Sequence, residues 1–343
     1  MLDLQNARIA LVGLGEMGRR FARLIENKNG LEIVAAVDVD PSKVGQELSA
    51  VAALKAHSGV RISDDLDFIL QEANPDLSIV ATTSFITEVF PLIEKCVKSG
   101  SHVITPCEEM IYPKARFPQL AKRIDESAKE NGVAVLGAGV NPGFFSDTLI
   151  ITLTGICIDI QRIRSARMND MSWGPMYSLR QLGVGFTIDE FDKRLTDGTI
   201  AGHVGFHESI HMIADSVGWE IEEVRASTKP IVSKTHRKAD IGLEVHPGMS
   251  AGTSQLAQGI MHGRPVIELE LQQQIRPEAE GVQIGDYIWI KGEPEINQAI
   301  RPGVSGGTST AAIVVNQIPK LLKAQPGLYS MKDMLVPSFF IRI

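Results

Sequence analysis

The sequence predicts an α/β protein in which a doubly wound parallel sheet is followed by a second domain of α+β type. Over residues 1–141, short apolar runs alternate with segments of helical periodicity, which is typical of a parallel sheet covered by helices on both faces. Over residues 142–302, strand-like runs alternate charged and apolar residues, which indicates a sheet with one face in solvent. Residues 303–343 are expected to form a helix and tail that return to the first domain.

Composition narrows the class of protein. With 343 residues, of which 44% are hydrophobic and 22% charged, the chain can bury an ordinary globular core. A net charge of −7 argues against nucleic acid or an anionic membrane as partner, because both require clustered Lys and Arg. No signal sequence or membrane helix is expected, so a cytoplasmic location is the expectation. The three cysteines form no CxxC motif, which suits a reducing compartment and argues against a structural zinc site.

The first strand and helix carry a dinucleotide-binding pattern. An apolar run at Arg8–Val12 is followed by a glycine turn, a helical segment and a second apolar run that stops at Asp38. This is the context of the Rossmann fingerprint, in which glycines allow a tight turn, close approach of a pyrophosphate and packing of helix on strand. The residues expected to bind the cofactor here are Gly13, Gly15, Glu16, Met17, Gly18 and Asp38.

The acid at the end of the second strand bears on the choice of nucleotide. A carboxylate at Asp38 can accept hydrogen bonds from the ribose hydroxyls and would repel a 2'-phosphate, which favours NAD. Four neighbours could nevertheless compensate a phosphate, so NADP stays an alternative. These neighbours are Arg19, Arg20, Ser42 and Lys43.

Three later strands of this domain also end in polar side chains. Apolar runs at 77–81, 101–105 and 133–136 are separated by helical segments. Ligands of such sheets bind beyond the carboxyl ends of the strands. We therefore expect the polar residues that follow these runs to lie near the nicotinamide: Thr82, Thr83, Ser84, Glu108 and Asn141.

Two groups in the second half have alternative interpretations. Arg167 and Asn169 lie two apart at a strand end, hence on one face, and could grip a substrate or form a surface ion pair with Asp170. Phe144 and Phe145 follow an Asn-Pro-Gly turn and could line a pocket or belong to the core.

Three histidines at helical spacing do not predict a metal site. His203, His207 and His211 recur every four residues, and the first and third would stand about 12 Å apart along a helix axis. They cannot share one ion, so no metal is expected, and a single histidine such as His203 in a substrate cleft is favoured.

Glu108 indicates the chemistry. Oxidation of an alcohol requires stabilisation of an alkoxide, which suits His or Lys, whereas loss of hydride from an amine leaves an iminium cation that a carboxylate stabilises. Burial would raise the pKa of that acid toward neutrality. The alternative is that Glu108 and Glu109 merely begin the next helix. A reactive Cys107 is disfavoured, because adjacent carboxylates raise a thiol pKa.

The combination of motifs resembles the 2,4-diaminopentanoate dehydrogenases and the related native amine dehydrogenases, within the dihydrodipicolinate reductase-like superfamily. The resemblance is carried by the glycine motif with Asp38, by CEE at 107–109, GAGVNPGF at 137–144, GHVGFHES at 202–209 and GVSGGTST at 303–310. In the wider superfamily the comparable strand ends in Thr-x-x-Lys, with a catalytic lysine. The resemblance implies that Glu108 occupies the position of this lysine, which selects Glu108 over Glu109 as the catalytic acid.

The resemblance also implies a function and a substrate pocket. It implies an NAD(P)-dependent amine dehydrogenase that acts on a small amine or, with ammonia, on a ketone or aldehyde, as a homodimer of two-domain subunits. Asn141 would touch the nicotinamide region. The implied polar side of the pocket is Arg167, Asn169 and His203, and the residues that could make it hydrophobic are Phe145, Met168 and Tyr177.

Two other functions stay open at this point. One is an alcohol or semialdehyde oxidoreductase, for which no lysine stands at the strand end. The other is a redox sensor that binds NAD without turnover.

Overall fold

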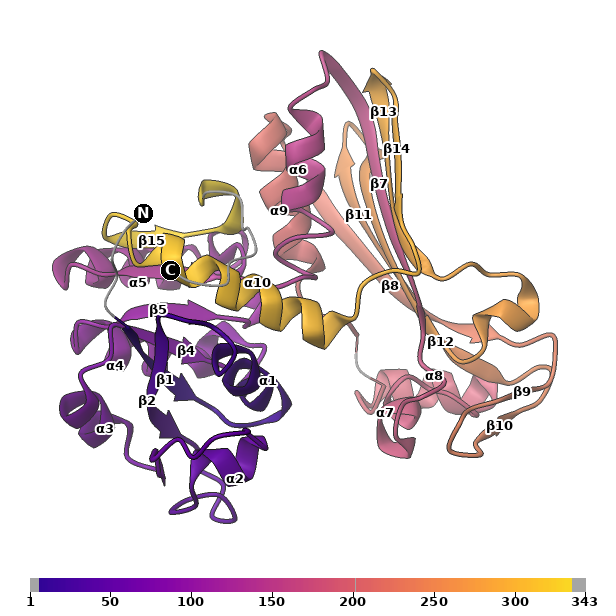
Figure 1. Ribbon diagram of the computed structural model, residues 1–343. Helices are drawn as coiled ribbons and strands as arrows, with labels where there is room; N and C mark the ends of the chain where they lie inside the picture. Colours follow the sequence, from indigo (N-terminus) through magenta and orange to yellow (C-terminus); the bar gives the residue numbers. More distant parts are fainter. Residues whose placement is uncertain (1–5, 201, 335–343) are drawn as a thin grey trace. The chain divides into compact units, whose positions relative to one another are not determined.

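The chain forms two compact units in the computed structural model, which describes residues 6–200 and 202–334 (Figure 1). The first unit combines the residues up to 148 with those from 305 onward, and the second unit comprises 149–304. The second unit is thus inserted into the first, and each is described by itself below.

The first unit contains a seven-stranded sheet in the order β15-β6-β5-β4-β1-β2-β3, and all of its pairings are parallel. The order reverses between β1 and β4, and this reversal is the switch point at which doubly wound sheets bind their ligands. The strands are β1 (Ala7–Val12), β2 (Leu31–Val37), β3 (Ile62–Ser63), β4 (Leu77–Val80), β5 (His102–Thr105), β6 (Ala134–Gly137) and β15 (Gly327–Tyr329).

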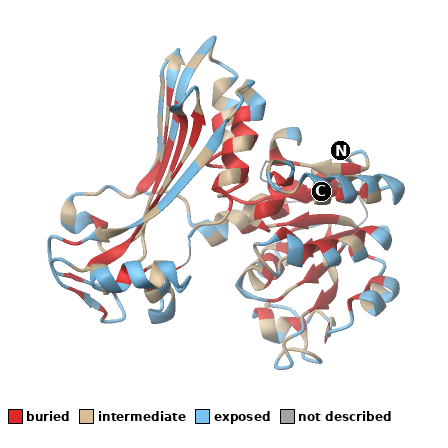
Figure 2. Cartoon of the chain, turned by 180° about the vertical axis from the view of Figure 1, so that it is seen from behind, coloured by how far each residue is buried: buried red, intermediate tan, exposed pale blue. Residues whose placement is uncertain are grey.

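Helices cover both faces of this sheet. They are α1 (Glu16–Ile25), α2 (Leu48–Ala52), α3 (Leu66–Ala73), α4 (Ile86–Lys98), α5 (Pro118–Glu130) and α10 (Gly306–Leu321), with short 3₁₀ helices η1 (Glu108–Met110), η2 (Pro113–Ala115) and η4 (Met331–Asp333). Phe21 of α1 and Val314 of α10 pack on one face, whereas Val89 of α4 and Ile124 of α5 pack on the other. Figure 2 shows the strands of this sheet as largely buried. The predicted parallel sheet with two covered faces is confirmed.

The second unit is built on a six-stranded mixed sheet in the order β14-β13-β7-β12-β11-β8, in which only the β7–β12 pair is parallel among the described residues. The strands are β7 (Asp159–Asp170), β8 (Glu223–Val232), β11 (Ser250–Met261), β12 (Arg264–Gln274), β13 (Gly285–Glu293) and β14 (Ile296–Ile300), and a separate hairpin pairs β9 (Arg237–Lys238) with β10 (Glu244–Val245). The accompanying helices are α6 (Thr148–Thr154), α7 (Met176–Gln181), α8 (Ile188–Thr196), α9 (Phe206–Val217) and η3 (Pro277–Glu280).

The alternation expected for one wet face is present in β7. Ile163 and Ser165 are buried, and Arg162 and Arg164 between and beside them are exposed. The predicted second domain of mixed helices and strands is confirmed.

Two local expectations differ from the structure. The helix expected to begin at His203 begins instead at Phe206, after Gly205, whose φ of +107° is the left-handed conformation that glycine adopts readily. The segment after Pro326, for which no element was predicted, supplies β15, which pairs with β6.

Candidate active site

The glycine loop between β1 and α1 has the geometry of a phosphate-binding turn. Gly13 has a φ of +91°, and a Cβ there would stand 2.5 Å from the carbonyl oxygen of Ala81. A Cβ at Gly18 would stand 1.9 Å from the carbonyl oxygen of Gly13, so helix and loop touch. At Gly15, by contrast, a Cβ would meet nothing within 4 Å. Gly13 therefore allows the tight turn, Gly18 allows the helix to pack on the loop, and Gly15 leaves the loop open to an approaching ligand. This division of roles fits a bound pyrophosphate.

Asp38 ties the glycine loop to the end of β2. Its carboxylate accepts hydrogen bonds from the backbone N–H of Leu14 at 2.7 Å and of Asp40 at 2.9 Å, and Lys43 Nζ lies 3.0 Å from it. Partial burial would raise the pKa of Asp38, but the two backbone hydrogen bonds and Lys43 outweigh burial and hold that pKa below its usual range. The residue is therefore an anion at the place where a dinucleotide presents its adenosine ribose.

A cleft of about 690 Å³ opens over the carboxyl ends of β1, β2 and β4. Its lining includes Gly13, Gly15, Asp38, Thr82 and Lys95. The cleft lies at the switch point of the sheet, so the residues present fit the adenosine and phosphate part of NAD.

Three of the four groups that could compensate a 2'-phosphate, namely all but Arg19, are bound to carboxylates. Lys43 pairs with Asp38 and also with Asp40 at 3.3 Å, and Ser42 Oγ donates to Asp40 at 2.7 Å. Arg20 donates to Glu16 at 2.6 Å. These bonds favour NAD over NADP, because a phosphate would have to displace them.

The Glu108 turn is fixed by contacts at the ends of three strands. Thr105 Oγ1 donates to the carbonyl oxygen of Val80 at 2.7 Å and accepts from the N–H of Cys107 at 3.1 Å. A Cβ at Gly137, at the end of β6, would stand 2.1 Å from the carbonyl oxygen of Met110. The backbone of β6 thus approaches η1 as closely as only glycine permits. The structure brings Glu108 to the edge of the sheet that the sequence predicted.

The environment of Glu108 suits an acid/base. Its burial raises the pKa above the ordinary value, a hydrogen bond with Ser84 opposes the rise, and the charge of Glu109 adds to it. A carboxyl group whose pKa is moved toward neutrality can both accept and release a proton near working pH.

Glu109 occupies a different environment. It is 5% exposed, accepts a hydrogen bond from the first backbone N–H of α4, at Ile86, at 2.8 Å, and pairs with Arg116 at 3.2 Å. The Glu109 carboxylate therefore caps the N-terminus of α4, a helix that precedes it in the chain. No local signal in the sequence could show this, because Ile86 lies 23 residues away.

The environment of Cys107 is unfavourable for a nucleophilic thiolate. Burial raises the pKa of its thiol to about 12, and the neighbouring carboxylates add to the rise. The sequence-based argument against a reactive thiol rests on the same physics.

The other polar residues predicted to surround the nicotinamide lie in the loops after β4 and β6. Thr82 is exposed and lines the cleft, and Thr83 Oγ1 donates to Glu88 at 2.7 Å. The turn that carries Asn141 is held to α10, because the N–H of Val140 donates to Thr310 at 3.2 Å.

The Asn-Pro-Gly turn also carries two aromatic residues. Phe144 is partly buried, whereas Phe145 is 1% exposed and its N–H donates to the carbonyl oxygen of Val140 at 2.8 Å. Phe145 is therefore almost wholly buried, and its role as a pocket wall stays a prediction.

Arg167 of the second unit forms a buried ion pair. Its Nε lies 2.7 Å from Asp286 Oδ1 on the adjacent strand β13, with the two side chains 4% and 0% exposed. Arg167 also donates to the carbonyl oxygen of Val304 at 2.9 Å, and the N–H of Val304 donates to Asp286 at 2.8 Å. The surface pair with Asp170 that we considered is wrong, because Arg167 points into the unit.

His203 lies close to Arg167. Burial and, to a smaller extent, the positive charge of Arg167 lower the pKa of His203 to about 4. Its backbone N–H donates to Gln255 at 2.9 Å, and its ring packs edge-on against Phe206 at 4.9 Å between centroids. Two of the predicted polar pocket residues are thus brought together, with the histidine neutral.

The remaining predicted pocket residues are spread over the second unit. Met168 and Asn169 are partly buried near the end of β7, and Tyr177 on α7 is 68% exposed. The assignment of these residues to a substrate pocket stays a prediction.

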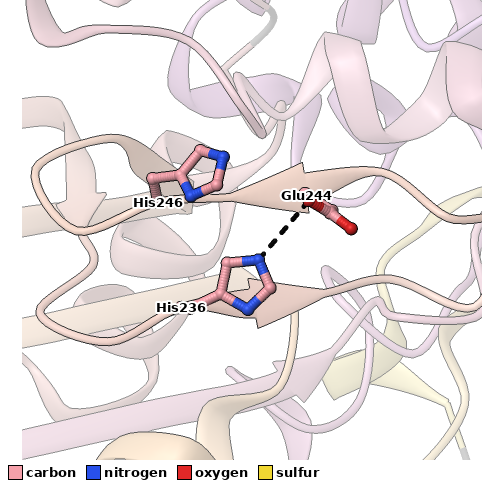
Figure 3. A group of neighbouring side chains, drawn as sticks. All are labelled: His236, Glu244 and His246. Carbon is pink, nitrogen blue, oxygen red and sulfur yellow. Dashed lines mark ion pairs between the residues drawn. The ribbon is translucent and has the colours of Figure 1, made fainter.

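Among the described residues, one group of side chains has the spacing of a metal site, on the β9–β10 hairpin (Figure 3). His236, Glu244 and His246 are exposed, and their ligand atoms lie within 4.8 Å of one another. The Glu244 carboxylate, however, already pairs with Lys238 at 3.1 Å. We assign the group no metal, because its three side chains are exposed and one oxygen of its carboxylate is already paired with an ammonium group.

An NAD-binding dehydrogenase is the class of protein that this fold and site define. The glycine loop and Asp38 are those of a dinucleotide site, and the acid of raised pKa stands at the same edge of the sheet. Residues 7–106 match the N-terminal domain of dihydrodipicolinate reductase, and residues 144–342 match the C-terminal domain of 2,4-diaminopentanoate dehydrogenase.

Two sequence relatives extend over nearly the whole chain. The 2,4-diaminopentanoate dehydrogenase of Acetoanaerobium sticklandii is 40% identical over 336 residues, which cover 97% of this chain and 95% of the relative. An amine dehydrogenase of Streptomyces virginiae is 28% identical and covers 94% of both chains. The protein belongs to the 2,4-diaminopentanoate dehydrogenase family, as the motifs indicated, and is an NAD(P)-dependent oxidoreductase that acts on amines.

Solved structures of related proteins have the same fold. The amine dehydrogenase from Mycobacterium smegmatis matches with a TM-score of 0.82 at 25% identity, covering 98% of each chain. A dihydrodipicolinate reductase from Paenisporosarcina matches with a TM-score of 0.55 at 15% identity, covering 96% of this chain and 99% of that one, and shows the fold alone. None of the helices within residues 6–200 and 202–334 combines the length and apolar character that crossing a bilayer requires.

Proposed function

We propose that the protein catalyses the NAD-dependent oxidative deamination of 2,4-diaminopentanoate or a closely similar small amine, and the reverse amination of the carbonyl product with ammonia. The observation that carries the proposal is the partly buried carboxyl group of Glu108, with its raised pKa, in the turn after β5. The substrate class follows from the relative that is 40% identical along almost the whole chain.

Glu108 acts on the nitrogen of the substrate. As a carboxylate it accepts a proton from the substrate ammonium group, which frees the nitrogen lone pair. When bound, NAD would supply the acceptor for the hydride that leaves the carbon bearing the nitrogen. The substrate is left as an iminium cation, which a nearby carboxylate stabilises. Glu108 releases its proton to solvent, accepts one from the water that attacks the iminium carbon, and returns it to the departing ammonia.

The first unit supplies the positioning. The glycine loop and the N-terminus of α1 would hold the pyrophosphate, and Asp38 would accept hydrogen bonds from the ribose. The homodimer, the cytoplasmic location and the substrate contacts of Phe144, Phe145, Arg167, Met168, Asn169, Tyr177 and His203 stay predictions.

Consumption of NADH and NADPH tests the proposal. We expect oxidation of NADH with 2-amino-4-oxopentanoate only when ammonium is present, and a lower rate with NADPH. Activity independent of ammonium would favour an alcohol or semialdehyde oxidoreductase. A melting temperature that rises with NAD, without turnover of any amine or ketone, would favour a redox sensor.

A variant isolates the role of Glu108. Glu108→Gln should lose activity by about 10²–10⁴-fold, the usual contribution of a general acid/base, with NAD binding retained. Glu72→Gln, on the exposed side of α3, is the matched control and should keep full activity. An active Glu108→Gln enzyme contradicts the assignment of this residue.

A further inference from the structure

Glu109 joins the turn that carries Glu108 to the loop that follows β4. The backbone N–H of Glu109 donates to the carbonyl oxygen of Ser84 at 3.3 Å, and its side chain accepts from the N–H of Ile86 at 2.8 Å. The two loops are therefore linked through both the backbone and the side chain of Glu109.

Burial makes the Glu109 contacts effective. The side chain is 6% exposed, and its other oxygen pairs with Arg116, which lies just after η2 and is 42% exposed. A buried carboxylate bound on both sides has little freedom to move, and its charge acts through a low-dielectric interior rather than through water.

We propose that Glu109 is a positioning residue for the amine reaction: its buried carboxylate fixes the Glu108 turn against the start of α4, and its charge acts on the Glu108 carboxyl group. This inference rests on the proposed role of Glu108. It assigns the second acid of the pair a function in the reaction without contact to the reacting atoms.

The charged groups around Glu108 determine whether its proton is lost more or less easily. The ionisable groups on the elements around this turn include Cys107, Glu109, Glu88 of α4, Arg116 and Lys332 of η4. Cys107 is a neutral thiol, Glu88 is exposed and bound to Thr83, and Lys332 stands over the Tyr112 ring. The charge of Glu109 makes loss of the Glu108 proton harder, and Arg116 partly neutralises that charge.

Two substitutions should therefore move Glu108 in opposite directions. Glu109→Gln keeps an oxygen for the N–H of Ile86 but removes the charge, so Glu108 should ionise about one pH unit lower. Arg116→Gln leaves the charge of Glu109 without its guanidinium partner, so Glu108 should ionise at higher pH, by about half a unit because Arg116 is partly exposed.

The experiment is the pH dependence of kcat/KM for oxidation of 2,4-diaminopentanoate, whose acid limb reports the ionisation of Glu108 in the free enzyme. We expect the limb to move to lower pH in Glu109→Gln and to higher pH in Arg116→Gln. Arg123→Gln, which removes an exposed guanidinium from α5, is the control and should leave the limb in place.

A second measurement does not depend on turnover. The carboxylic acid C=O band that disappears in Glu108→Gln can be followed in infrared difference spectra as pH changes, in wild type and in both variants. The inference is supported if the pH at which this band appears is lower in Glu109→Gln and higher in Arg116→Gln than in wild type, whether or not the amine is the substrate. It is overturned if this pH is unchanged, or if it moves in the same direction in both variants, and Glu109 is then only a structural cap of α4.

Discussion

Disruption of the buried ion pair of Arg167 and Asp286 should cost the second unit more stability than disruption of an exposed ion pair on the same strand. The two side chains are 4% and 0% exposed and lie 2.7 Å apart. Arg167→Met leaves the Asp286 carboxylate buried without its guanidinium partner, which costs about 3–5 kcal/mol. For a unit of roughly 150 residues, about 2–4 °C is lost per kcal/mol, so Tm should fall by about 6–20 °C.

A neighbouring pair on the same strand provides the control. Arg164 lies 3.0 Å from Glu270, but the two side chains are 47% and 15% exposed. An exposed pair contributes about 0–1 kcal/mol, so Arg164→Met should change Tm by at most a few degrees. Replacing both members of the buried pair, as in Arg167→Met with Asp286→Leu, should recover much of the loss, because no buried charge is left.

Urea and thermal unfolding followed by circular dichroism measure these differences. Should Arg167→Met be too unstable to purify, Arg167→Lys keeps the charge but loses the bond to Val304 or to Asp286, and an intermediate loss is expected. The reasoning fails if Arg167→Met unfolds with the same midpoint as Arg164→Met. In that case a change confined to KM for the amine would favour the substrate contact predicted from the sequence.

The remaining predictions concern the cofactor loop and pH. Asp38→Ser should weaken NAD and improve NADP by about tenfold each in kcat/KM, because it removes the ribose ligand and releases Lys43 for a 2'-phosphate. Gly18→Ala should lower the Tm of the nucleotide-free protein, since its Cβ meets a carbonyl oxygen at 1.9 Å, whereas Gly15→Ala, with nothing within 4 Å, should keep that Tm and weaken NAD binding about tenfold. His203→Gln should reduce the loss of stability as pH falls from 6.5 toward 4: over this window the unfolded histidine binds a proton that the folded one, whose pKa is about 4, does not.

Each of these has a direct measurement. Initial rates with the two nucleotides give the Asp38→Ser ratio, and retention of the wild-type NAD preference would contradict the role of Asp38. Calorimetry gives Tm and NAD affinity for the glycine variants, and equal loss of apo Tm in both would contradict the distinction drawn between them. For His203, an unchanged slope of unfolding free energy against pH would show that another group titrates in this window.

The sequence predicted the elements whose causes are local. The turn at Gly13–Gly18, the acid at Asp38 and the position of Glu108 at a strand end all follow from residue types within a few positions of one another. The periodicity of apolar residues is likewise a local signal, so the layers of the first unit were predictable.

What the sequence could not show depends on distant partners. Asp286 lies 119 residues from Arg167, and Ile86 lies 23 residues from Glu109, so neither bond leaves a trace in local spacing. The strand β15 is three residues long and is stabilised by its pairing with β6 rather than by its own composition. His203 lies before α9, because the helix begins only after Gly205, which has a left-handed backbone conformation. The spacing of apolar residues gives no sign of this conformation.

The interruption of the first unit by the second has a consequence for biosynthesis. Strands β1 to β6 emerge from the ribosome first, yet β15 and α10, which complete the edge and one face of their sheet, come only after residue 304 has been translated. Until then the edge of β6 and the apolar side chains beneath α10 stand uncovered, in the crowded surroundings where nascent chains aggregate. The inserted unit has all of its own strands before that moment, so it can finish folding while the nucleotide-binding half still waits for its last segment.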